Sequence, residues 1–221
     1  MKILILAALE KEIVILTKLI KAEAKGRFYY AKTNNNEVYT ALSGVGILNA
    51  TTSTYALIEE IKPDIIINIG TAGGHTLEVN EGDIIVCDKA IYHGGYIMKD
   101  EPISWKTIED TDLVINGDEK LSKLVDKINV DASIYHGATL SGDFFTKEED
   151  IIKALNNKYH HLCEDMETIA VYKVCQEKKI PTIAIRIISN NELRGTLYQD
   201  HVYIVNEKLQ RFIVEFLHYL N

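Results

Sequence analysis

The chain has 221 residues, of which 47% are hydrophobic, so it is long and apolar enough to bury a substantial core. Its formal net charge of −8 at pH 7 argues against a nucleic-acid backbone or an anionic membrane surface as the main partner. An acidic enzyme that acts on a small neutral molecule fits this composition better.

Cysteine usage and the N-terminal segment exclude further classes. The three cysteines, Cys87, Cys163 and Cys175, form no CxxC pair and no His/Cys cluster, so neither a disulfide framework nor a metal site is indicated. The apolar run at the start of the chain is short, and the charged residues 10–12 interrupt it before any cleavage site. No run approaches the roughly 18 apolar residues of a membrane span. We therefore expect a cytoplasmic protein.

Strand-like and helix-like segments alternate along the first half of the chain. Short, continuous apolar runs are typical of strands that are covered on both faces, and apolar positions at helical spacing predict helices. In chain order, the sequence predicts a strand at 2–9, a helix at 10–22, a hairpin of strands at 27–33 and 37–43, a helix at 47–62, and strands at 64–70 and 82–92.

The second half continues the alternation after a break. Weak periodicity from about Gly95 to Asp118 predicts a long loop. Beyond it, the sequence predicts a strand at 132–142, helices at 147–155 and 166–179, a strand at 182–189 and a closing helix at 202–220. Such alternation indicates an α/β fold, and the lack of a Ser/Gly-rich linker or repeat predicts one domain over 1–221.

Unusual residues follow four of the predicted strands. They are the charged residues 10–12, the glycine-flanked turn 43–46, the glycine-rich run 70–74, and Asn190. In α/β sheets, ligands bind beyond the carboxyl ends of the strands, so these positions are candidates for one site.

Each of these features also has an ordinary structural explanation. Glu12 suits the dipole of a first helical turn, and Asp165 and Glu167 could simply cap and charge the helix that follows them. His93 and His136 are isolated and are interpreted as structural. No GxxxxGK[ST] loop or GxGxxG fingerprint is present, which argues against nucleoside triphosphate hydrolysis and dinucleotide binding.

A series of sequence blocks, taken in order along the chain, favours a functional explanation of these residues over the ordinary structural one. They are ILAALEKEI, SGVG, PDIIINIGTAGG, GDIIVCD, SGDFF, EDMETIAVYKVC and PTIAIRIIS. Over nearly the whole chain they resemble the nucleoside phosphorylase/nucleosidase superfamily and, within it, the 5'-methylthioadenosine/S-adenosylhomocysteine nucleosidases. The resemblance implies a central mixed β-sheet flanked by helices on both faces, a purine nucleoside as the small-molecule substrate, a homodimer, and no cofactor or metal.

The resemblance assigns two carboxylates to the reaction. Glu12 occupies the place of the general base that deprotonates the attacking water, and Glu167 that of the carboxylate that accepts the ribose hydroxyls. This division is chemically reasonable, because N-glycosidic cleavage passes through a positively charged, oxocarbenium-like sugar. Met166 would pack against the sugar through its flexible thioether.

The resemblance also implies the surroundings of the substrate. Phe145 is expected to stack on the purine, and Thr71 to lie near the ribose and the attacking water. Arg186 and Asn190 are expected at the catalytic centre with Glu12. The remaining expected substrate contacts lie on the glycine turns, after Phe145 and near the last helix; they are Val45, Gly73, Thr146 and Tyr198.

Arg186 stands inside an otherwise apolar strand. A buried charge is costly unless it is paired, so we predict a carboxylate partner for it. Glu12 is the candidate for that partner.

Water is the expected nucleophile. Phosphorylases of the superfamily hold phosphate with arginines near the first strand and the glycine-rich turn, and this chain has none in either segment. Lys11 is the only cation near these segments. A phosphate dianion would therefore be held poorly.

Asn190 departs from the family pattern, because an aspartate is expected there to protonate the leaving base. A carboxamide has no acidic proton to give, but its oxygen and NH₂ match the N7–H and O6 edge of a 6-oxopurine. Asn190 therefore favours an inosine-, guanosine- or futalosine-type nucleoside as an alternative substrate. An asparagine could still bridge adenine by accepting from the 6-amino group and donating to unprotonated N7.

Two other interpretations remain open. The segment 92–112 does not follow the family pattern that closes the pocket for the 5' substituent, so the sequence does not identify that substituent. A nucleoside-binding protein that has lost catalysis is a further alternative. The retention of Glu12, Glu167 and Arg186 argues against it, since a pure binder needs no water-activating base.

Overall fold

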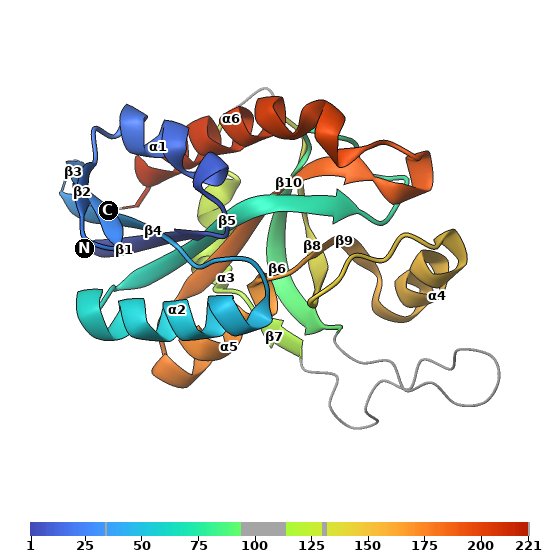
Figure 1. Ribbon diagram of the computed structural model, residues 1–221, viewed down its shortest axis with the longest axis horizontal. Helices are drawn as coiled ribbons and strands as arrows, with labels where there is room; N and C mark the ends of the chain where they lie inside the picture. The colour runs from blue at the N-terminus through green and yellow to red at the C-terminus, as the bar shows by residue number, and fades with distance from the viewer. Residues whose placement is uncertain (34, 94–113, 130–131, 221) are drawn as a thin grey trace.

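Three buried strands form the centre of the sheet: β1 (Lys2–Ala7), β5 (Ile65–Gly74) and β10 (Thr182–Asn191). In the computed structural model, which describes residues 1–33, 35–93, 114–129 and 132–220, β5 pairs in parallel with both of the others. Every residue of β10 is buried, because helices cover both of its faces (Figure 1). This explains why its sequence is a continuous apolar run rather than an alternating one.

The other strands extend this centre to both sides. They are β2 (Glu23–Lys25), β3 (Phe28–Thr33), β4 (Asn36–Leu42), β6 (Ile84–Tyr92), β7 (Val114–Asn116), β8 (Ile134–Ser141) and β9 (His161–Asp165). The strand order is β10-β6-β8-β9-β5-β1-β4-β3-β2, with β7 beside β6. Because β10 also pairs with β5, the strands β5, β10, β6, β8 and β9 close into a ring. Parallel and antiparallel pairs are both present, so the predicted mixed sheet is confirmed.

Helices pack on both faces of the sheet, as predicted. Figure 1 shows α1 and α6 on one face and α2 and α5 on the other. Among the described residues, no helix is both long and apolar enough to cross a membrane. The helical elements are the short turns η1 (Glu10–Glu12) and η2 (Glu192–Arg194), and the helices α1 (Val14–Leu19), α2 (Ile47–Ile61), α3 (Glu119–Val125), α4 (Glu149–Tyr159), α5 (Thr168–Lys178) and α6 (Tyr198–Leu217).

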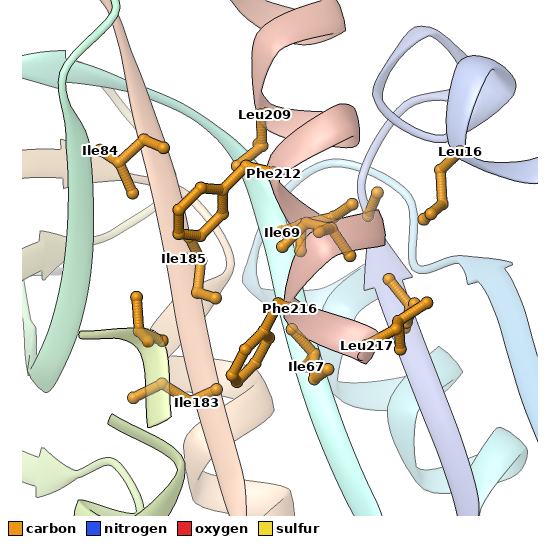
Figure 2. Close-up of a cluster of buried hydrophobic side chains, with 14 of the residues drawn as sticks. Leu16, Ile67, Ile69, Ile84, Ile183, Ile185, Leu209, Phe212, Phe216 and Leu217 are labelled. Atoms are coloured by element: carbon orange, nitrogen blue, oxygen red, sulfur yellow. The ribbon is translucent and has the colours of Figure 1, made fainter. Parts of the chain in front are cut away.

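The alternation of side chains along each strand divides the core into two layers. On β1, Ile3 and Ile5 pack with the residues of α6, whereas Leu4 and Leu6 pack with those of α2 and α5. Figure 2 shows the first layer, where Phe212 and Phe216 of α6 lie against isoleucines of β5 and β10. This period of two along the strands determines which side chains can reach the α5 face, where Arg186 is found.

The structure differs from the sequence prediction in several segments. The predicted helix 10–22 is divided into η1 and α1, because the Glu12 side chain accepts hydrogen bonds from the amides of Ala8 and Leu9 and tightens the first turn. Strands β2 and β9 and helix α3 were not predicted, and β9 is a polar segment that only its pairing with β5 and β8 makes a strand. Strand β7 lies within the predicted loop, of which residues 95–113 are outside the described residues.

The packing of Phe212 predicts a large loss of stability in Phe212→Ala. The side chain is 2% exposed in the core between α6 and the sheet, so truncation should lower the free energy of unfolding by about 3–5 kcal/mol. Tyr203→Ala is the matched control, because Tyr203 lies on the same helix and is 77% exposed; its loss should stay within about 0.5 kcal/mol. Urea denaturation at equal protein concentration measures both, and equal losses would contradict this packing.

Candidate active site

A cavity of about 530 Å³ opens where β1, β5 and β10 end. Because these three strands are parallel, their carboxyl ends meet at one edge of the sheet, where α/β proteins bind ligands. The side chains that line it come from segments far apart in the sequence. They are Ala8, Leu9, Glu12, Val45, Thr71, Ala72, Gly73, Phe145, Lys147, Met166, Glu167, Ser189, Asn190, Glu192, Thr196, Leu197 and Tyr198.

Most of the site residues that the sequence suggested lie on this cavity. The members of this group that line it are Glu12, Val45, Thr71, Gly73, Phe145, Met166, Glu167, Asn190 and Tyr198. Arg186 and Thr146 do not line it. Both are buried behind its wall, with exposed fractions of 1% and 2%.

Glu12 is a buried carboxylate held by backbone amides. Its Oε2 atom accepts hydrogen bonds from the N–H groups of Ala8 (3.1 Å) and Leu9 (3.0 Å). Its Oε1 atom accepts from the backbone N–H of Thr71 (3.1 Å) and from the Thr71 hydroxyl (3.3 Å). The side chain is therefore fixed in one orientation at the cavity wall.

Arg186 has the predicted carboxylate partner, but that partner is Asp165 and not Glu12, so the candidate was wrong. The distance from Arg186 Nε to Asp165 Oδ2 is 3.2 Å, and Nη2 donates to Asn68 Oδ1 (2.5 Å) and Thr168 Oγ1 (2.7 Å). The reason is strand geometry: Arg186 shares its face of β10 with Ala184 and Ile188, which pack against α5, and Asp165 directly precedes that helix.

The Arg186 guanidinium nevertheless lies close to Glu12. A Cβ atom at Gly70 would be 2.9 Å from Arg186 Nη1 and 3.2 Å from Glu12 Oε1, so a glycine is needed to let the two side chains approach. Burial lowers the pKa of Arg186, but Asp165 and Glu167 raise it above its ordinary value, so this group stays a cation. A permanent positive charge therefore lies behind the cavity wall.

Asp165 is the anion that compensates this cation, and it also caps α5. Its Oδ1 atom accepts from the backbone N–H groups of Glu167 (2.9 Å) and Thr168 (2.8 Å), as the capping interpretation proposed. Burial raises the pKa of Asp165, but Arg186 and the hydrogen bonds from Thr168 and Ser141 hold it below its usual value. Asp165 is fully buried and does not reach the cavity.

Glu167 faces the cavity in a different electrostatic environment. Its Oε1 atom accepts a hydrogen bond from the Gly46 N–H (2.9 Å), and the side chain is otherwise surrounded by the cavity wall. Burial raises the pKa of Glu167 to about 7, although the Arg186 charge lowers it. A carboxylate that accepts few protein donors is free to accept hydroxyl groups of a ligand.

Thr146 anchors the loop that carries Phe145 instead of lining the cavity. Its backbone N–H and hydroxyl donate to the two oxygens of the buried Glu164, at 2.6 and 3.0 Å. Burial raises the pKa of Glu164 to about 7 and lowers that of the adjacent His75 to about 4, which shifts both side chains toward their neutral forms. The half-exposed Phe145 ring is thereby held at the cavity rim.

Sequence reasoning missed several residues of the cavity, and two of them are charged. Lys147 lies beside the Phe145 loop, and Glu192 follows the end of β10 by one residue. Lys11, the only cation that the sequence suggested near the site, donates instead to the Tyr198 hydroxyl at 2.6 Å. The sequence did contain a signal for Glu192, because this residue lies in the polar segment that follows the predicted strand 182–189.

Within the part of the chain that the structure describes, no cluster of three or more His, Cys, Asp or Glu side chains is arranged to hold a metal ion. The three cysteines are buried and unpaired. The cavity offers three carboxyl groups, from Glu12, Glu167 and Glu192, with the buried Arg186 cation behind its wall and the Phe145 ring at its rim.

Comparison with known proteins gives the same picture. A model of the phosphorylase superfamily matches residues 2–218. A 5'-methylthioadenosine/S-adenosylhomocysteine nucleosidase of Staphylococcus aureus is 31% identical over 201 residues, which are 84% of this chain and 85% of the relative.

Two solved structures from Helicobacter pylori share the fold. One is a 5'-methylthioadenosine/S-adenosylhomocysteine nucleosidase with butyl-thio-DADMe-Immucillin-A, at a TM-score of 0.85 and 22% identity; the match covers 98% of this chain and 97% of that chain. The other is a futalosine hydrolase, at a TM-score of 0.84 and 21% identity, with the same coverage. The chain therefore belongs to the phosphorylase superfamily and, within it, to the 5'-methylthioadenosine/S-adenosylhomocysteine nucleosidase family.

Proposed function

We propose that the protein is a purine nucleosidase that hydrolyses the N-glycosidic bond of 5'-methylthioadenosine/S-adenosylhomocysteine-type nucleosides. The observation that carries this proposal is the pair of buried carboxylates, Glu12 and Glu167, on one cavity with Met166 and Phe145. The names of the curated relatives, including the Staphylococcus aureus protein, support the same activity.

The two carboxylates divide the reaction between them. Glu12 takes a proton from water as the water oxygen attacks the anomeric carbon, while the bond from that carbon to the purine breaks and its electron pair leaves with the base. Glu167 accepts the ribose hydroxyls, and its negative charge stabilises the positive sugar. Met166 lies directly before Glu167 and packs on the sugar, and Phe145 stacks on the base.

Water is favoured over phosphate as the nucleophile. Among the described residues, no arginine lines the cavity, and Arg186 is committed to Asp165, Asn68 and Thr168. Lys147 is a single, exposed cation on the wall. One such point charge holds a phosphate dianion weakly, because it lacks the bidentate geometry of an arginine.

A 6-oxopurine nucleoside is the second candidate substrate. The feature that favours it is the amide of Asn190 at the cavity wall, and a futalosine hydrolase shares the fold at a TM-score of 0.84. The relatives near 30% identity are named for adenine nucleosides, which places adenine first. A catalytically weak nucleoside-binding protein is disfavoured, because Glu12 is buried and oriented at a cost that binding alone does not require.

The cellular setting extends this proposal. We place the enzyme in the cytoplasm as a homodimer that serves nucleoside catabolism and methionine salvage. Support for a dimer comes from apolar side chains exposed near the cavity mouth, since Val45 is 41%, Leu48 74% and Leu197 63% exposed. A second subunit that covers them would help to close the pocket for the 5' substituent.

Base release identifies the substrate directly. We expect the protein to release adenine from methylthioadenosine and S-adenosylhomocysteine at the same rate with and without phosphate, as measured by chromatography. Adenosine, inosine, guanosine and futalosine are the comparison substrates. Strict dependence on phosphate would contradict hydrolysis, and release of hypoxanthine or guanine alone would favour the 6-oxopurine reading.

Glu12→Gln should lower kcat by a factor of about 100 or more, because an amide cannot take a proton from water. The amide also loses one of the hydrogen bonds that Thr71 and the turn donate, at a stability cost of about 1–3 kcal/mol. Binding of a nucleoside, measured by calorimetry, should persist and shows that the variant is folded. Glu10→Gln is the control, since Glu10 is exposed and outside the cavity and should remain active. A fully active Glu12→Gln enzyme would refute the general-base role.

The pKa of Glu167 predicts the acid limb of the pH profile. Its pKa is raised to about 7, so the carboxylate is protonated below that pH and loses its capacity to accept both ribose hydroxyls. The value of kcat/KM should therefore fall about tenfold per unit as pH drops below about 6. The residual activity of Glu167→Gln should lack this limb, and a wild-type profile that is flat from pH 5 to 8 would contradict it.

A further inference from the structure

Asn190 leaves the proposed reaction without an acid at the position where the family has one. A purine leaves poorly as an anion, so its N7 atom needs a proton as the glycosidic bond breaks. An asparagine cannot supply it. The described part of the cavity wall contains three carboxyl groups, and Glu12 and Glu167 already act on the water and the ribose. The third is Glu192.

Glu192 is attached directly to Asn190. The Asn190 Nδ2 atom donates to Glu192 Oε1 at 2.7 Å, and the Asn190 Oδ1 atom accepts from the Ser189 hydroxyl at 2.8 Å. The Ser189 hydroxyl in turn lies 3.2 Å from the Ala72 carbonyl of β5. This chain of contacts fixes the amide, and the amide fixes the carboxyl group on the same cavity.

The backbone that carries Glu192 is also held in place. Asn191 Nδ2 donates to the carbonyls of Thr76 (2.8 Å) and Val79 (2.9 Å), and its Oδ1 atom accepts from the Leu193 N–H at the start of η2. Asn191 is fully buried. Glu192 therefore projects from a rigid turn and not from a loose loop, as a catalytic side chain requires.

The charges around Glu192 are compatible with an acid. Its neighbours in the electrostatic field are Lys147 on the opposite loop and the buried Glu164. Burial raises the pKa of Glu192, while Lys147 and the hydrogen bond from Asn190 oppose that rise. The carboxyl group thus keeps its proton to a higher pH than an exposed glutamate does.

We propose that Glu192, held by Asn190, is the general acid that protonates N7 of the leaving purine. Asn190 is then a positioning residue. The general acid is at position 192, two residues after the position at which the family has it. This inference rests on the proposed nucleosidase function.

The proton balance closes with these groups. Water forms the new bond to the anomeric carbon and gives a proton to Glu12, while the bond between that carbon and N9 breaks and its electrons enter the purine ring. Glu192 gives its proton to N7, so the base leaves as a neutral molecule. After release, Glu12 loses its proton to solvent and Glu192 regains one, which restores the enzyme.

The same arrangement reverses the preference that Asn190 alone suggested for the base. The amide oxygen of Asn190 accepts from Ser189 and one of its N–H groups donates to Glu192, so the amide is oriented toward the carboxyl group of Glu192. The ionised Glu192 carboxylate accepts both N7–H and the 6-amino group of a protonated adenine. A purine with a 6-amino group is therefore the better match.

The test compares two leaving groups in Glu192→Gln. Methylthioadenosine needs protonation of its base, whereas 4-nitrophenyl β-riboside releases a stable phenolate without it. Glu192→Gln should lose a factor of about 100 or more in kcat on methylthioadenosine and less than about threefold on the nitrophenyl riboside. The wild-type pH profile on methylthioadenosine should have a basic limb that the variant lacks. Glu148→Gln, an exposed glutamate outside the cavity, is the control.

A second variant tests whether the acid can be moved back. The double variant Asn190→Asp with Glu192→Gln places a carboxyl group at position 190 and should recover at least about tenfold in kcat over Glu192→Gln alone. Equal losses of Glu192→Gln on both substrates, or no loss on either, would overturn the inference while the nucleosidase function stands. If the wild-type protein releases base from no nucleoside, the proposed function fails, and the inference with it.

Discussion

The buried ion pair between Arg186 and Asp165 is the interaction on which the site depends. A lone guanidinium at the centre of this sheet would be desolvated at a cost of several kcal/mol, and Asp165 compensates it at 3.2 Å. Asn68 on β5 accepts a further N–H group. One cation therefore joins β10 to β5 and β9 and sets the positions of their carboxyl ends. Glu12 and Glu167, two of the three cavity carboxylates, lie around the same positive charge.

The site also shows how one cavity gives similar groups different chemistry. Glu12 has both oxygens occupied by donors of the turn and of Thr71, so its orientation is fixed before any ligand arrives. Glu167 accepts a single backbone N–H, from Gly46, and burial raises its pKa to about 7. Two glutamates of one cavity therefore differ in how many protein donors they accept, although they are the same residue type.

The polar tip of β10 illustrates how a substitution is understood only with its neighbours. Asn190 by itself removes an acid and suggests a different base. In the structure, Asn190 Nδ2 donates to Glu192 Oε1 at 2.7 Å and so orients a carboxyl group on the same cavity wall. The chemistry of a position can thus pass to a neighbour when the turn that carries both is rigid, and the buried side chain of Asn191 provides that rigidity.

The sequence alone determined the α/β class, most strands and helices, and the motif positions that meet at the cavity, because periodicity and motif order are local properties of the chain. It did not determine strand β9, the partner of Arg186 or the place of Thr146, and it did not single out Glu192. Each of these depends on contacts between distant segments. Segment 161–165 is a strand only because it pairs with β5 and β8. The alternation of side chains along β10 places Arg186 on the face where Asp165 lies. Only the tertiary structure sets sheet register and burial, and these decide which polar groups meet.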